Sequence, residues 1–205
     1  PIMAIAALES CATFDFFSST SRLLADYDGE KTVSYPLTLP LPSWLVFVKF
    51  ALSRALFLGC LLSIIMPLEK LILGGVLDFS HFSTLKFMFA YVTLCICAGI
   101  FGVWASSIPK NIGHLGTVWH RYLFPLWWFG GSIFPYYSVA KAFPWLSKLL
   151  LINPFIYANE SLRFAVLGTQ TPTLPFWPCV GALWVVIVVL GLWGTLRLRR
   201  KLDFV

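Results

Sequence analysis

The sequence predicts an all-α membrane protein, a polytopic bundle of transmembrane helices. Hydrophobic residues make up 59% of its 205 residues and charged residues only 12%, whereas soluble domains carry about 25% charged residues. The apolar residues are also gathered in runs of about 20, the length that an α-helix needs to cross the hydrocarbon core of a bilayer. So little charge could not cover a water-facing surface, which excludes a soluble fold.

Five apolar segments have the length and composition of membrane spans. They cover residues 1–17, 44–67, 85–104, 118–134 and 178–196. Because the chain begins with Pro1 rather than Met, we expect it to be a fragment or a processed product. If the native N-terminus is cytoplasmic, one further span precedes residue 1 and the native protein has six. Residues 1–205 are expected to form a single transmembrane domain.

Two segments between the spans differ from ordinary loops. Residues 18–43 are polar and then rich in proline, and prolines at this density prevent one continuous helix. Residues 135–175 hold Lys, Glu and Arg among apolar residues and are broken by Pro144 and Pro154. We expect two short amphipathic helices there, lying at the membrane interface or dipping into it.

The basic residues predict the orientation. If the C-terminus is placed inside and the segments alternate, ten Lys and Arg residues, Arg54 among them, fall inside and five outside, which accounts for all 15. Cytoplasmic loops carry an excess of Lys and Arg, so we expect a cytoplasmic C-terminus. The net charge of +6 follows from this distribution and indicates no nucleic-acid partner.

A series of short motifs precedes the last span in a specific order. The motifs are Phe129-Gly-Gly-Ser-Ile-Phe-Pro135, Pro144-Trp-Leu146, Asn153-Pro-Phe-Ile-Tyr157, Glu160-Ser-Leu-Arg163 and Leu167-Gly168. In this combination the chain resembles the permeases of ABC-2 type transporters, with the polysaccharide and nodulation-factor exporters as the most similar branch. The resemblance implies an outer re-entrant motif formed by Gly130, Gly131, Phe134, Pro135, Asn153, Pro154, Glu160 and Arg163.

The resemblance extends to residues 18–43. There the family has a cytoplasmic segment that couples the permease to its motor, and this chain reads Lys31-Thr-Val-Ser-Tyr-Pro-Leu-Thr-Leu-Pro40. A short helix bounded by prolines is stiff and can transmit the closure of a motor domain. The expected coupling residues are Glu30, Thr32, Ser34, Leu37 and Pro40.

Candidate pathway residues come from two features. Glu9 lies in an apolar run, where an acidic side chain is a functional candidate by default, although its helix can simply begin near the headgroups. Phe124, Trp127 and Trp128 form an aromatic stretch that either lines a path for a glycolipid or belongs to the interfacial aromatic belt.

Glu160 and Arg163 are three residues apart and can pair on one helix face. The simpler interpretation is a pair that lets an amphipathic helix rest at the interface. The alternative is an external gate or a substrate contact.

The sequence contains no G-x-x-x-x-G-K-[ST] loop, so ATP and Mg²⁺ are expected on a separate ATPase subunit and no cofactor on this chain. No metal-ligand spacing or hydrolase motif is present, and we expect no enzyme. The resemblance implies the permease of an exporter in a bacterial cytoplasmic membrane, moving a lipid-linked saccharide, a polysaccharide or a drug. Its expected partners are the ATPase, a second permease copy and membrane lipids. An ATP-independent channel or carrier and a membrane-embedded assembly factor are the alternatives.

Overall fold

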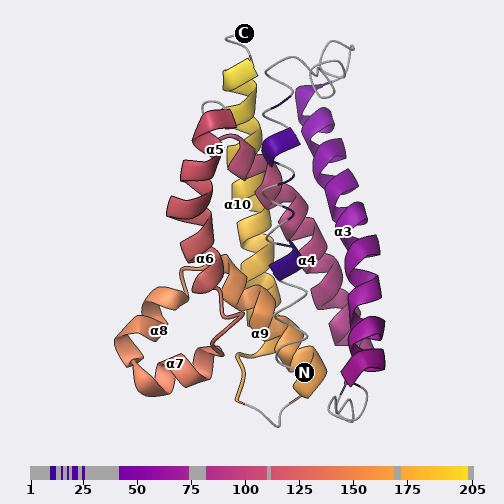
Figure 1. The fold of residues 1–205 in the computed structure, drawn as a ribbon, viewed down its shortest axis with the longest axis vertical. Coiled ribbons are helices and arrows are strands. Elements are labelled where there is room, and N and C mark those ends of the chain that lie inside the picture. Colours follow the sequence, from indigo (N-terminus) through magenta and orange to yellow (C-terminus); the bar gives the residue numbers. More distant parts are fainter. Residues whose placement is uncertain are drawn as a thin grey trace.

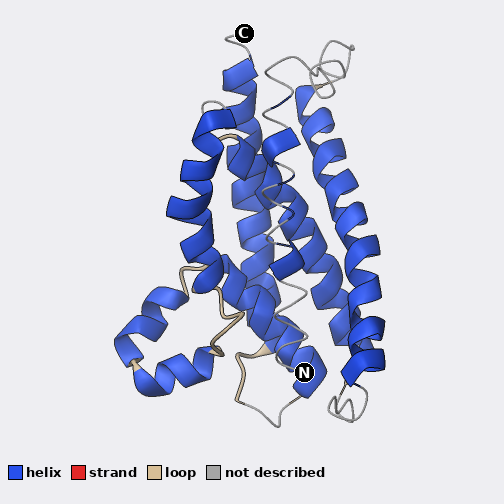
Figure 2. Ribbon diagram, viewed as in Figure 1, coloured by secondary structure: helices blue, strands red, loops and turns tan. Residues whose placement is uncertain are grey.

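A computed structural model of the protein describes residues 10–12, 15, 18, 20–22, 25, 42–73, 82–109, 112–168 and 172–202. Across these residues the regular structure is helical and contains no strand (Figure 2), which confirms the all-α fold class. In chain order the labelled helices are α3 (Ser43–Leu73), α4 (Thr84–Ser106), α5 (Ile112–Val118), the π-helical turn η2 (Trp119–Leu123), α6 (Phe124–Trp128), α7 (Tyr136–Ala142), α8 (Pro144–Leu150), α9 (Pro154–Leu167) and α10 (Phe176–Leu202).

Three of the described helices are long and apolar enough to cross a membrane. The qualifying segments are Trp44–Ile65 in α3, Thr84–Ser106 in α4 and Phe176–Arg200 in α10. They correspond to three of the predicted spans, and α10 continues a few residues beyond the predicted end. The predicted first span, residues 1–17, lies almost entirely outside the described residues.

The predicted span 118–134 differs from the structure. The helix begins earlier, at Ile112, ends at Trp128, and is followed by a turn over residues 129–135. The aromatic residues of this turn are as hydrophobic as those of a span. A prediction from hydrophobicity alone therefore included the turn in the span. The double glycine within the turn is the local signal that ends the helix.

The long helices alternate in direction (Figure 1). α3 begins at the end of the bundle where α10 terminates, α4 returns toward that end, and the helix formed by α5, η2 and α6 runs away from it again. We call the end that carries Arg197, Arg199 and Arg200 the basic end. The short helices α7 and α8 and the longer α9 lie together at the opposite end, the α9 end.

The helix α4 occupies the centre of the bundle. It packs against both α3 and α10, and α9 packs across α4 and α10. A Cβ atom on Gly99 would lie 2.2 Å from the carbonyl oxygen of Ala51, so the backbones of α3 and α4 are in direct contact. Such close approach through small residues is the usual way in which helices associate in lipid, where apolar burial alone provides little driving force.

The helix from Ile112 to Trp128 contains the single π turn η2, and Pro125 explains it. Proline has no N–H to donate, and its ring would clash with the carbonyl group four residues earlier, that of Arg121. Phe124 instead donates its N–H to the carbonyl oxygen of Trp119, five residues earlier. The helix therefore continues past the proline.

Candidate functional site

The turn over residues 129–135 closely approaches α9 and depends on two glycines. Gly131 has φ of 85°, in the left-handed region that side chains disfavour. A Cβ atom on Gly130 would lie 2.6 Å from the Cβ of Phe155 on α9. One glycine therefore provides the turn conformation, and the other permits the close approach to α9.

Polar side chains of α9 and of the residue before it hold this turn and the end of α6. The Nδ2 of Asn153 donates to the carbonyl oxygen of Leu126 at 2.6 Å, and that of Asn159 donates to the carbonyl oxygen of Gly130 at 2.9 Å. The Nη2 of Arg163 donates to the carbonyl oxygen of Gly131 and, at 3.5 Å, to that of Ser132. Buried backbone carbonyl groups need hydrogen-bond donors. These side chains provide the donors that the backbone N–H groups of the next turn would provide within a helix.

Glu160 completes the arrangement. Its Oε1 accepts from the Nη1 of Arg163 at 2.6 Å and from the backbone N–H of Tyr136 at 3.2 Å, and its Oε2 accepts from the backbone N–H of Leu174 at 3.3 Å. We call Asn153, Asn159, Glu160 and Arg163 the α9 clamp. It connects the turn, the start of α7 and the segment that leads into α10.

The ion pair of the α9 clamp is buried, which corrects the simpler interpretation given above. The side chains of Glu160 and Arg163 are each 1% exposed, so the pair does not rest α9 on the interface. A buried ion pair offsets its desolvation only when further hydrogen bonds satisfy both partners. Here backbone N–H groups satisfy both oxygens of Glu160, and the turn's carbonyl oxygens accept from the Nη2 of Arg163, whereas its Nε is buried without a hydrogen-bond partner.

The Asn-Pro motif starts α9. The Oδ1 of Asn153 accepts from the N–H of Phe155 at 3.1 Å, and Pro154 occupies the first helical position. An N-cap side chain followed by proline is a favoured helix start. Proline lacks an N–H, and an N–H at the first helical position would have no partner within the helix in any case. Asn153 thus caps α9 with its oxygen and holds α6 with its nitrogen.

Two residues of the predicted motif, Gly131 and Phe134, line a small hollow. Phe134 and Trp128 line it together with residues of α7 and α8, and its volume is about 280 Å³. Pro135 stands immediately before α7. The hollow is apolar and lies at the α9 end.

Two of the three candidate pathway aromatics do not line this hollow. Phe124 lies 5.4 Å from Trp127 and 6.1 Å from Trp128 between ring centroids, so the three rings form one cluster on α6. Of the three, Trp128 is the exposed one and it alone reaches the hollow. The structure therefore brings together Trp128 and Phe134, which were predicted as parts of separate features.

The remaining predicted site residues lie outside the described part of the chain. They are the candidate pathway residue Glu9 and the coupling residues Glu30, Thr32, Ser34, Leu37 and Pro40. Among the described residues, no group of three His, Cys, Asp or Glu side chains could hold a metal ion.

One charged pair was not predicted. Arg54 was predicted to lie on the inner side of the membrane. It is the eleventh of the 22 residues of the span Trp44–Ile65 and therefore lies at its middle. It is 7% exposed, forms an ion pair with Asp15, and its guanidinium lies 5.0 Å from the ring centroid of Phe57. An arginine within one apolar run and an acid within another are the signal that could have suggested the pair.

Asn159 was also absent from the predicted site, although it is fully buried and bonds the turn. Its role depends on the glycine carbonyl that packs against it, and no local pattern shows that contact.

Comparison with known families agrees with this architecture. A sequence model of ABC-2 type transporters matches residues 5–167. The chain belongs to the ABC-2 type transporter family. The match confirms the resemblance drawn from the motifs and covers the α9 clamp as well as residues 18–43. No curated protein and no solved structure matched the chain.

Membership of this family and the three apolar helices of spanning length together show that this ABC-2 permease is a multi-pass membrane protein and a transport component. The part that the family model matches ends with α9, and α10 follows it as a further helix of spanning length.

Proposed function

We propose that this ABC-2 permease exports an amphiphilic substrate across a bacterial cytoplasmic membrane, as one of two identical copies driven by a separate ATPase subunit. ATP and Mg²⁺ would bind to that subunit. The coupling segment, with Glu30, Thr32, Ser34, Leu37 and Pro40, would insert into it on the cytoplasmic side, where the C-terminus would also lie.

The observation that carries this proposal is the polar outer face of the helix formed by α5, η2 and α6. Gly116, Thr117, His120 and Arg121 are all exposed on it. The outer faces of α3 and α10 are instead covered by apolar residues such as Leu56, Val185 and Leu192.

A charged side chain is costly against lipid, so within a membrane it faces protein or a water-filled cavity. The helix of 17 residues is about 25 Å long, which is most of the hydrocarbon thickness. Its polar face is thus the part of the described bundle best suited to meet a second copy and to line a path with it.

The same helix suits an amphiphilic substrate. The polar face holds Arg121, whose guanidinium matches a phosphate or carboxylate group. The cluster of Phe124, Trp127 and Trp128 follows on α6 and provides stacking surfaces for a sugar ring or an acyl chain. A lipid-linked saccharide combines these chemical features.

Co-purification tests the ATPase partnership. We expect a full-length tagged permease, solubilised in a mild detergent, to bring an ATP-hydrolysing subunit with it. Leu37→Asp should release that subunit, because a charge would spoil a packed coupling contact. Lys141→Asp, on α7 at the opposite end of the bundle, is the control and should retain it. An absence of any ATPase in several mild detergents would favour the channel or carrier alternative.

Cysteine cross-linking tests the second copy and the path. In a variant without the five native cysteines, Thr117→Cys should cross-link two permeases in membranes. Val189→Cys, on the apolar outer face of α10, is the matched control and should leave monomers. Cross-linking through Val189 but not through Thr117 would show that the copies meet along a different face.

A further inference from the structure

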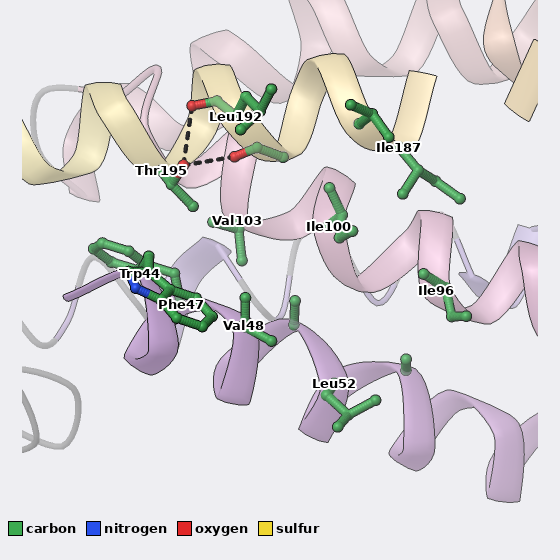
Figure 3. Close-up of a pocket in the computed structure, with 14 residues that line it drawn as sticks. Trp44, Phe47, Val48, Leu52, Ile96, Ile100, Val103, Ile187, Leu192 and Thr195 are labelled. Atoms are coloured by element: carbon green, nitrogen blue, oxygen red, sulfur yellow. Dashed lines mark hydrogen bonds between the residues drawn. The ribbon is translucent and has the colours of Figure 1, made fainter. Parts of the chain in front are cut away.

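An apolar groove runs between α3, α4 and α10 (Figure 3). Its volume is about 520 Å³, and Trp44, Val48, Ile100, Val188 and Gly191 are among the residues that line it. It belongs neither to the α9 clamp nor to the hollow beside α8.

The groove presents almost no polar surface. The hydroxyl of Thr195, which lines it, shares its single proton within its own helix between the carbonyl oxygens of Gly191 at 2.8 Å and Leu192 at 2.9 Å (Figure 3). A hydroxyl occupied in this way offers a ligand no hydrogen-bond donor. The groove therefore suits a hydrocarbon rather than a sugar or a charged group.

The groove covers only half the depth of a bilayer. Along α3 it runs from Trp44 to Ala55, which is about 16 Å at the helical rise per residue. The hydrocarbon core is about 30 Å thick, so one leaflet contributes about half of that. A transmembrane helix of a partner would need a groove through the whole depth, whereas the acyl chain of a lipid enters from one leaflet only.

The groove extends to the basic end of the bundle, where Trp44 and Thr195 line it. Arg199 follows Thr195 by four residues, so it lies one turn further along the same face of α10 and is exposed there. Arg197 lies on nearly the opposite face of the helix, since residues two apart differ by about 200° around the axis. Basic residues next to the end of a span attract the headgroups of anionic lipids.

We propose that this groove binds one acyl chain of an anionic phospholipid from the leaflet at the basic end, with Arg199 beside the lipid phosphate. The bound chain fills the space between the first half of α3 and α10, two helices that have few direct contacts with each other. The lipid thereby connects α3 to α10, in addition to the direct packing of α3 on α4.

Two adjacent valines provide a matched test of the apolar part. Val188 lines the groove and Val189 does not, and they are 55% and 54% exposed. The full-length permease is reconstituted into nanodiscs of phosphatidylglycerol and phosphatidylcholine, extracted in mild detergent, and the retained lipid is measured by native mass spectrometry. Val188→Trp should lower retention about tenfold, the effect of displacing about two methylene groups. Val189→Trp should retain lipid like the wild type.

Gly191→Leu is a second filling variant. A Cβ at this position meets the Cγ2 of Ile100 at an ordinary 3.5 Å, so the larger side chain enters the groove without displacing the backbone. It should lower retention as Val188→Trp does.

Two arginines test the charged part. Arg199→Gln should abolish the preference for phosphatidylglycerol over phosphatidylcholine, and Arg197→Gln should keep it. Equal retention of the two lipids by the wild type, or equal retention by Val188→Trp and Val189→Trp, would overturn the proposal. Loss of permease dimers in Val188→Trp with unchanged lipid would also overturn it, because the groove would then be a protein interface. None of these readouts depends on ATPase binding or on transport.

Discussion

Arg163 donates to Glu160 across one turn of α9 at 2.6 Å, and each side chain is 1% exposed. Around this pair, Glu160 accepts two backbone N–H groups and Arg163 donates to the turn after α6. The pair thus fixes the turn, α7 and the start of α10 to α9, so that this end of the permease should move as one unit during transport.

Removing one partner of this pair should destabilise the protein strongly. Arg163→Met leaves Glu160 buried with an uncompensated charge, and we expect a loss of about 3–5 kcal/mol. The double variant Arg163→Met with Glu160→Met should recover part of that loss, because it leaves no charge unpaired. Thermal unfolding in detergent, followed through tryptophan fluorescence, measures both. Lys148→Met, an exposed cation on α8, is the control, and an Arg163→Met protein as stable as this control would contradict the clamp.

The turn after α6 should not tolerate a side chain at its first glycine. Gly130→Ala places a Cβ 2.6 Å from the Cβ of Phe155, and overpacking of this kind costs about 1–3 kcal/mol. Gly116→Ala meets no atom within 4 Å and is the matched control. The midpoint of thermal unfolding should fall for the first variant only. Equal midpoints would show that the turn can move away from α9.

The contact between α3 and α4 should also not tolerate an added side chain at its glycine. Gly99→Ala would force a Cβ against the carbonyl oxygen of Ala51, so the two helices must separate. We expect a smaller yield of folded protein in membranes and about 1–3 kcal/mol less stability. Gly181→Ala on α10 has open space around it and should behave like the wild type. A normal yield of Gly99→Ala would indicate that α3 is loosely held.

The ion pair of Asp15 and Arg54 should be restored by exchange of its charges. Arg54→Asp alone places two acids together in the membrane and should sharply reduce folded protein. Adding Asp15→Arg restores one cation and one anion at the same place, so the yield should recover in part. Lys49→Asp, an exposed residue of the same helix, is the control. A double variant no better than Arg54→Asp would mean that the two residues are not coupled.

The sequence by itself determined that the protein lies in a lipid bilayer and where its long helices are. α3, α4 and α10 follow from apolar runs of spanning length, which are local properties of the chain. The start of α9 and the turn before α7 are also local, because Asn-Pro favours a helix start and Gly-Gly ends a helix. The predicted coupling residues lie outside the described part of the chain and stay a prediction.

Only the tertiary structure decided which faces of these helices pack together. Spacing shows that Glu160 and Arg163 can pair, but their burial depends on the turn that covers them. Likewise Arg54 has a partner only because another helix brings Asp15 beside it. In lipid a helix is apolar on its outer and inner faces alike, so no amphipathic pattern in the sequence marks the buried one. Contacts such as Gly99 against Ala51, and the groove between α3 and α10, therefore arise from packing rather than from any local pattern.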